Sequence, residues 1–146
     1  MKKLLILCMV SAAIVSCGPS SLLYYWGGFQ KETTTYENLT YRNLEKQTPE
    51  SICRLFCMYE DIVTNCGGVR KMPPPGICAE YGYMLLNPEN AEIFAKYATA
   101  KQKRIYPKTD YASYFAERGK EMMLMEIELY PESSKFVTPL IERFCK

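Results

Sequence analysis

The chain contains no histidine among its 146 residues. This absence excludes Ser-His-Asp and Cys-His catalysis, the usual general base near neutral pH, and every zinc site that uses an imidazole ligand. The sequence also has no glycine-rich phosphate loop, no Gly-x-Ser-x-Gly turn and no Cys-x-x-Cys pair. These absences remove the common ways of building a nucleophile, a nucleotide site or a redox site. We therefore expect no catalytic residue, no cofactor and no bound metal.

A large charge of one sign is missing as well. The formal net charge is +2, and no long run of consecutive lysine and arginine residues occurs. Nucleic-acid binding depends on clustered basic residues, so nucleic acid is excluded as a partner, and no small-molecule substrate is expected. The acidic residues are scattered, and Glu60, Asp61, Glu126 and Glu128 are expected on solvated helix faces.

Long alternating strand patterns are absent, whereas apolar residues recur at helical spacing in several segments. The clearest helix starts at Pro49 after a Thr48 cap and stops at Gly67-Gly68. The connector Pro73-Pro74-Pro75-Gly76 precedes the next helix, which Asn87-Pro88 ends. The remaining helices are expected at 34–46, 89–105, 110–129 and from about 136, where Pro139 predicts a kink or a late start. The predicted fold class is all-α, with about five to six helices arranged as helical hairpins.

The most apolar stretch lies at the N terminus and is short. Lys2 and Lys3 precede apolar residues 4–10 and 12–15, and the small Ser16 stands directly before Cys17. A membrane-spanning helix needs about 20 apolar residues, so this stretch resembles a secretory signal. Its end, Ile14-Val15-Ser16-Cys17, resembles the lipobox of bacterial lipoproteins, which implies cleavage before Cys17 and a lipid on its thiol. The alternative is an ordinary secretory signal that happens to contain a cysteine.

The lipoprotein interpretation divides the chain into three parts. Residues 1–16 are the signal peptide, residues 17–30 a lipidated tether with an aromatic cluster around Trp26, and residues 31–146 a single helical domain. Residues 18–23 reach at most about 20 Å, which keeps the domain beside the membrane. Gly18 stands at the position where an aspartate would retain enteric lipoproteins in the inner membrane. The resemblance therefore implies that the protein is located on the periplasmic face of the outer membrane. We expect Trp26 to pack on the helices, with the headgroup layer or a partner as alternatives.

Five cysteines follow Cys17, and an odd number leaves at least one unpaired or paired between chains. Two of them lie one helical turn apart in a predicted helix, and two others flank the proline-rich connector. The periplasm permits structural disulfides, and buried free cysteine is equally expected. The candidates are Cys53, Cys57, Cys66, Cys78 and Cys145.

Two sets of residues resemble known families. Gly82 and Pro107 lie near the glycine-to-proline distance of a tetratricopeptide repeat, although Cys78 and Tyr81 replace the usual Trp and Leu. Most of the chain after the signal is similar to a family of small bacterial lipoproteins with a tetratricopeptide-like domain of unknown function. The residues that carry this second resemblance are Cys17-Gly18-Pro19, Leu23-Tyr24-Tyr25-Trp26-Gly27, Pro74-Pro75-Gly76, Ala79-Glu80-Tyr81-Gly82 and Leu129-Tyr130-Pro131-Glu132-Ser133.

Members of that family resemble accessory lipoproteins encoded beside a relative of the curli-secretion channel lipoprotein, which implies an envelope assembly rather than an enzyme. Residues 87–109 depart from the short turn usual in the family. We interpret them as an inserted helix between a helical pair. The alternative is that Gly82 and Pro107 define the repeat and the following helix stacks on it.

The leading hypothesis is a non-enzymatic helical scaffold, anchored to the outer membrane through Cys17 and bound to other envelope lipoproteins. One alternative is a disulfide-linked envelope dimer, and another is a small cell-wall-associated enzyme that uses carboxylates such as Glu80 or Glu117. Aromatic anchors dominate many protein interfaces. The candidate partner contacts are Tyr24, Tyr25, Trp26, Tyr81, Tyr97 and Tyr114.

Overall fold

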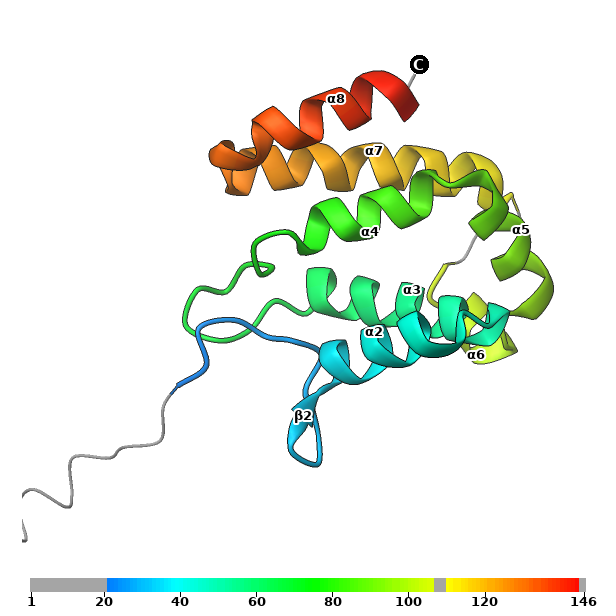
Figure 1. Cartoon of the computed structure of the whole chain (residues 1–146), viewed down its shortest axis with the longest axis horizontal. Helices are drawn as coiled ribbons and strands as arrows, with labels where there is room; N and C mark the ends of the chain where they lie inside the picture. The colour runs from blue at the N-terminus through cyan, green and yellow to red at the C-terminus, as the bar shows by residue number, and fades with distance from the viewer. Residues whose placement is uncertain (1–20, 107–109, 145–146) are drawn as a thin grey trace, which may run out of the picture.

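The computed structural model describes residues 21–106 and 110–144, so the signal segment, Cys17 and Cys145 lie outside the described residues. The described part is all-α apart from one very short hairpin (Figure 1). No helix within it is both long enough and apolar enough to cross a membrane. In chain order the elements are β1 (Phe29–Gln30), β2 (Thr33–Thr34), α2 (Thr35–Lys46), α3 (Pro49–Thr64), α4 (Ile77–Leu86), α5 (Pro88–Tyr97), α6 (Ala100–Lys103), α7 (Tyr111–Leu129), the 3-10 turn η1 (Pro131–Ser133) and α8 (Ser134–Phe144).

Helix α3 lies at the centre of the fold and has the boundaries that its sequence predicts. The Thr48 hydroxyl accepts a hydrogen bond from the Ser51 amide at 3.2 Å, and Pro49 occupies the first turn, where its missing N–H costs nothing. The apolar stripe of α3 then faces α2, α4 and α5. Its side chains Leu55, Phe56 and Ile62 are buried.

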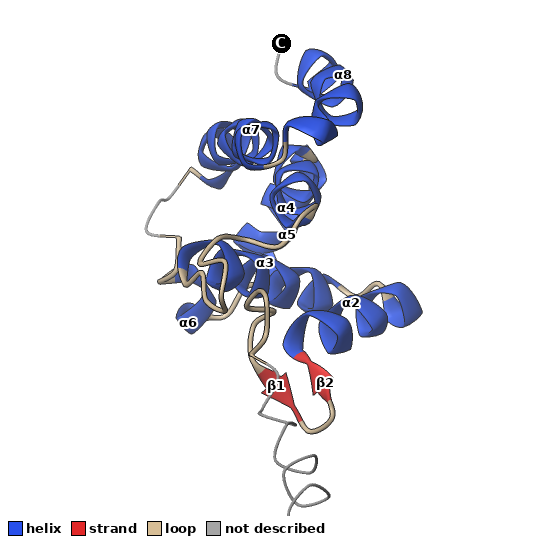
Figure 2. Ribbon diagram, turned by 90° about the vertical axis from the view of Figure 1, so that its left-hand side faces the viewer, coloured by secondary structure: helices blue, strands red, loops and turns tan. Residues whose placement is uncertain are grey.

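The long helices form a layered stack in the order α2, α3, α4, α7 and α8 (Figure 1). The end-on view shows these helices as a staggered column, with the β1–β2 hairpin projecting beyond α2 (Figure 2). Aromatic rings fill the middle of the stack. Phe56 of α3 lies 4.9 Å from Phe115 of α7 and 5.8 Å from Phe94 of α5, measured between ring centroids, which are ordinary distances for aromatic pairs in a core.

Helices α4 and α7 cross at a pair of glycines. A Cβ atom on Gly82 would lie 2.8 Å from the carbonyl oxygen of Gly119, so only glycine allows this separation. Helix α4 pairs with α7, so α5 and α6 lie in sequence between two paired helices. Residues 107–109, between α6 and α7, are outside the described residues.

The predicted helix over residues 89–105 is wrong as a single element. The chain leaves the helix at Ala98, and Thr99 starts the separate short helix α6. The Thr99 hydroxyl accepts from the Gln102 amide at 3.3 Å, while the Gln102 side chain accepts from the Thr99 amide at 2.8 Å. This capping box satisfies two backbone groups that a continuous helix would use differently, and it outweighs the helix-favouring alanines around it.

Two further boundaries differ from prediction. Helix α8 begins at Ser134, five residues before Pro139, so the predicted late start is wrong. Pro139 is the sixth of the eleven residues of α8, and it cannot donate the usual helical hydrogen bond to the Lys135 carbonyl.

The predicted division between tether and domain at residues 30 and 31 is also wrong, because β1 and β2 pair across it, with Phe29 opposite Thr34. Trp26 packs against Tyr36 with ring centroids 5.1 Å apart. The aromatic segment therefore belongs to the domain, and Trp26 packs on the helices as expected.

Candidate functional site

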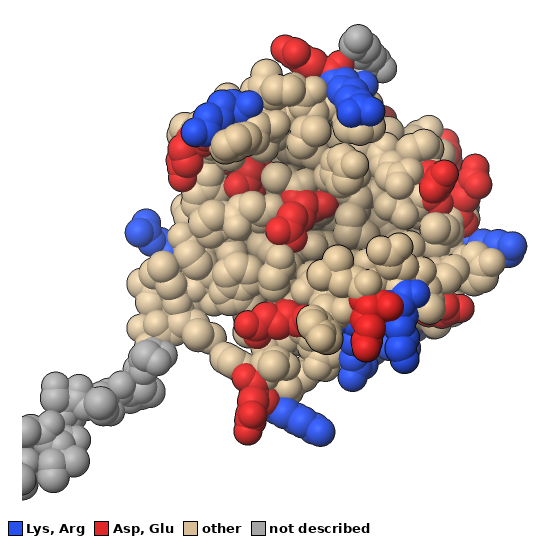
Figure 3. Space-filling model, viewed as in Figure 1, with Lys and Arg blue, Asp and Glu red and all other residues tan. Residues whose placement is uncertain are grey.

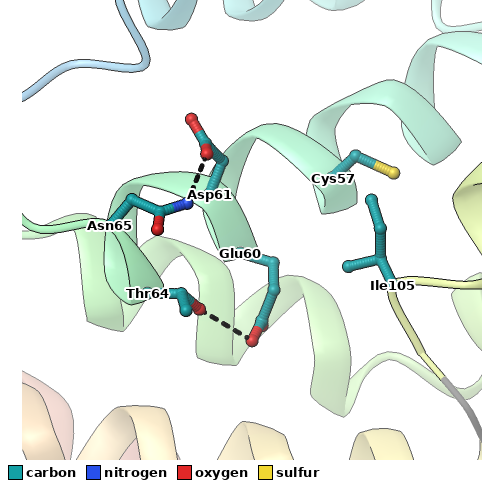
Figure 4. Close-up of a pocket in the computed structure, with 6 residues that line it drawn as sticks. All are labelled: Cys57, Glu60, Asp61, Thr64, Asn65 and Ile105. Carbon is teal, nitrogen blue, oxygen red and sulfur yellow. Dashed lines mark hydrogen bonds between the residues drawn. The ribbon is translucent and has the colours of Figure 1, made fainter.

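A shallow groove runs along α3 on one face of the stack (Figure 4). Its volume is about 270 Å³, and apart from Ile105 its lining residues come from the second half of α3 and from Asn65, which caps the end of that helix. Asn65 donates to Asp61 at 2.7 Å and Thr64 donates to Glu60 at 3.2 Å, which fixes both carboxylates along the groove wall. The lining residues are Cys57, Glu60, Asp61, Thr64, Asn65 and Ile105.

Glu60 forms the inner wall of the groove and connects three helices. Its carboxylate accepts from the Tyr81 hydroxyl of α4 at 2.6 Å and from the Arg118 guanidinium of α7 at 2.9 Å. The Tyr81 hydroxyl also lies 2.7 Å from that of Tyr106, which donates to the Phe56 carbonyl at 2.8 Å. The expectation of a solvated Glu60 is therefore wrong, because this carboxylate is half-buried and bonded on both oxygens.

Two other carboxylates are bonded to tyrosines in the same way. Tyr25, from the N-terminal segment, donates to Asp61 at 2.8 Å. Glu80 of α4 accepts from Tyr36 of α2 at 2.9 Å and from Tyr59 of α3 at 2.8 Å. Each carboxylate thus ties neighbouring layers of the stack together through phenolic hydroxyls. These pairs cannot be recognised from the sequence, because their members are 21 to 44 positions apart.

The tyrosines in this network are held in their protonated form. Burial, together with the hydrogen bond to Glu80, raises the pKa of Tyr36 to about 12. Burial also raises the pKa values of Tyr59, Tyr81 and Tyr106, and the nearby carboxylates act in the same direction. A hydroxyl that stays protonated at neutral pH donates hydrogen bonds and does not serve as a general base. The network is therefore suited to holding the helices together rather than to proton transfer.

Glu126 is a second acidic residue whose predicted solvent exposure is wrong. It is expected on a solvated face, but its side chain is buried between α7 and the start of α4. One carboxylate oxygen accepts from the Gly76 amide at 2.8 Å, while the other has no hydrogen-bond partner. Gly76 has no side chain to cap α4, so α7 supplies the capping carboxylate. Burial raises the pKa of Glu126, although the amide hydrogen bonds act against the shift.

The four described cysteines are free thiols, so the disulfide considered among Cys53, Cys57, Cys66 and Cys78 is absent. Cys53 and Cys78 are fully buried in the apolar core, where cysteine behaves as a small hydrophobic residue. Burial raises the pKa of Cys53 and of Cys57 to about 11, and that of Cys78 to about 12. These thiols are protonated at neutral pH and therefore weak nucleophiles.

The predicted partner contacts occupy very different environments. Tyr81 is completely buried, so its assignment as a contact is wrong: it stacks on Tyr59 with ring centroids 5.6 Å apart. Tyr97 is 40% exposed at the end of α5, and it alone among the six is classed as exposed. The other four, Tyr24, Tyr25, Trp26 and Tyr114, are half-buried.

The carboxylates of the enzymatic alternative lie apart from the groove. Glu80 is bound by two tyrosine hydroxyls, and Glu117 is exposed on α7. Within residues 21–106 and 110–144, no three histidine, cysteine or acidic side chains are grouped so that they could hold a metal ion. Comparison with family models, curated proteins and solved structures found no match to this chain.

Proposed function

We propose that this protein is a bacterial lipoprotein, anchored through Cys17 to the periplasmic face of the outer membrane, whose helical domain is a non-enzymatic scaffold for another envelope lipoprotein. The lipobox-like sequence supports the anchor, and the resemblance to accessory lipoproteins of a secretion-channel-like assembly supports the class of partner. The groove on α3 is bonded internally through Glu60 and Asp61, which favours a structural role for it.

The observation that carries the scaffold proposal is the apolar outer face of the first helix of the stack. Tyr41 and Leu44 of α2 are 71% and 74% exposed, and no residue of α2 is buried. These two side chains lie three positions apart and so share one helix face. Helical stacks need polar terminal faces to remain single in solution. An apolar face at the end of the stack therefore favours a partner that continues it.

The surroundings of this face suit a protein partner. A hollow of about 340 Å³ beside Tyr41 is lined by Thr33, Glu37, Asn38 and Arg42. An apolar centre with a polar and charged rim is the usual composition of a binding hot spot and its border. Because the anchor holds the domain beside the membrane, a partner that is also lipid-anchored would meet this face at a high effective concentration.

The test is recovery of the partner from detergent-solubilised envelopes after chemical crosslinking. The wild-type chain should recover one lipoprotein or channel component, and the double variant Tyr41→Ala with Leu44→Ala should lose it while keeping its helical circular dichroism. Leu124→Ala is the matched control, because Leu124 is also half-exposed but lies on α7 within the stack. Recovery that is unchanged in the α2 variant would contradict the proposed surface.

The anchor is tested separately with Cys17→Ala. This variant should retain an unprocessed N terminus, carry no lipid and no longer fractionate with the outer membrane, because the thiol that carries the lipid is gone. A variant that is still processed at residue 17 and still membrane-bound would show that the chain does not depend on a lipid at Cys17.

A further inference from the structure

The N-terminal segment is clamped to the turn that follows α3. The Val69 amide donates to the Leu22 carbonyl at 3.1 Å, and the Arg70 amide donates to the Leu23 carbonyl at 3.0 Å. Gly68 has a positive φ of 73°, and a Cβ atom on it would lie 2.7 Å from the Leu23 carbonyl oxygen. The N-terminal segment and the turn after α3 can therefore approach this closely only because residue 68 is glycine.

This clamp presents three large apolar side chains to solvent. Leu22 is 48% exposed, Leu23 49% and Val69 60%. Arg70 and Lys71 are also exposed and directly follow Val69. We call the set Leu22, Leu23, Val69, Arg70 and Lys71 the clamp surface.

The charged residues of the clamp itself are basic. Segments 21–28 and 66–76 contain no aspartate or glutamate, and their charged residues are Arg70 and Lys71. The face shown in Figure 3 has acidic side chains across it and basic ones mostly near its edges. An apolar centre beside basic residues matches the boundary between acyl chains and anionic headgroups.

The length of chain before the clamp decides which surface lies nearby. Leu22 is the fifth residue after Cys17, so their Cα atoms are at most about 18 Å apart. If Cys17 carries a lipid, as proposed above, the clamp surface lies within this distance of the bilayer. The turn and the N-terminal segment are at the left-hand end of the stack, opposite α5 and α6 (Figure 1).

We propose that the clamp surface rests on the anionic phospholipid leaflet and fixes the orientation of the domain on the membrane. Leu22, Leu23 and Val69 enter the headgroup boundary, and Arg70 and Lys71 pair with lipid phosphates. The axes of α3, α4 and α7 then rise from the membrane, and α5 and α6 face away from it. The proposal rests on the lipid anchor and adds a second, non-covalent contact.

The test uses the full lipidated protein in vesicles of phosphatidylethanolamine and phosphatidylglycerol that contain a phospholipid with a photoreactive acyl chain. After irradiation, lipid adducts should map to the peptides holding Leu22–Leu23 and Val69. Arg70→Glu and Lys71→Glu should each lower the adduct yield at Val69 up to about fivefold, and raised salt should act likewise. Lys96→Glu, Lys101→Glu and Leu124→Asp are matched controls on exposed positions elsewhere and should leave the yield unchanged.

Flotation with the vesicles and the mass of the N-terminal peptide report on the anchor independently of the adduct map. A protein that floats and carries the lipid but shows adducts only elsewhere, for example on the α2 face, would overturn the clamp surface and leave the anchor standing. A chain that neither floats nor carries lipid would overturn both. Val69→Asp with wild-type circular dichroism and an unchanged adduct map would also refute the proposal.

Discussion

Replacing Gly82 by alanine tests the packing on which the stack depends. The added Cβ would lie 2.8 Å from the Gly119 carbonyl oxygen and 3.2 Å from the Met123 amide nitrogen. Both are backbone atoms of α7, so no side-chain rotation relieves the contact. An ordinary contact begins near 3.4 Å, so α4 and α7 must separate by roughly 0.6 Å, a gap that forfeits about a quarter of the attraction between facing atoms.

The net effect is the difference of two terms. Overpacking against backbone belongs in the upper half of the usual range, about 2–3 kcal/mol. Alanine in place of an interior helical glycine returns about 1 kcal/mol. Gly82→Ala should therefore lower the free energy of unfolding by about 1–2 kcal/mol and the melting temperature by about 4–8 °C, measured by urea and thermal unfolding followed by circular dichroism.

Two companion variants make the result interpretable. Ala116→Gly, at an exposed position of α7, measures the helix-propensity term alone and should cost about 1 kcal/mol. Gly119→Ala should cost less than Gly82→Ala, because its closest new contact at 2.8 Å is the Leu86 side chain, which can move. A Gly82→Ala protein as stable as the wild type, or more stable, would refute the reasoning about the crossing.

Three other predictions concern the buried polar groups. Glu60→Gln should destabilise the fold by about 1–3 kcal/mol in urea unfolding, because Arg118 keeps only its ion pair with the exposed Glu121 and Tyr81 competes for one remaining acceptor oxygen. An unchanged midpoint would contradict this. Glu126→Gln should match or exceed wild-type stability at neutral pH, since an amide oxygen still accepts from Gly76 without a buried charge. Glu126→Ala removes the cap and should lower the free energy of unfolding by about 1–2 kcal/mol. The pKa of Tyr36 is about 12 in the fold and 10.0 when unperturbed. Its contribution to the free energy of unfolding is therefore complete below pH 10 and is lost between pH 10 and 12. Tyrosinate absorbance that titrates fully near pH 10 without unfolding would contradict the buried network.

Local signals explain which elements could be predicted from the sequence. Helix α3 begins where Thr48 and Pro49 predict it, and α7 begins after its Asp110 cap. Such caps involve residues two or three positions apart, so they can be recognised without a three-dimensional structure. The break before α6 uses the same chemistry, but the surrounding alanines hide it in the apolar pattern. The β1–β2 hairpin is too short to show any alternation.

Groups that pair over long sequence distances could not be predicted. Glu126 belongs to a stretch that reads as a polar helix face, yet it caps a helix whose first residues are 50 positions away. Tyrosine is a common residue at interfaces, and only the hydrogen bonds of Tyr81 to Glu60 of α3 and Tyr106 after α6 show that it belongs to the core. The reduced cysteines likewise follow from tertiary placement. Candidate binding surfaces, notably the clamp surface, could therefore be identified only from the side chains that are exposed in the folded chain.

The carboxylate of Glu126 at the start of α4 has a consequence for the order in which the chain becomes structured. Translation produces α4 long before α7, and until α7 arrives the first turn of α4 lacks its cap and Gly82 lacks its partner. A nascent chain that ends between α5 and α7 thus holds an incomplete helix with exposed apolar residues, a state prone to aggregation. That exposure would last until residues 111–129 are available to pack on α4.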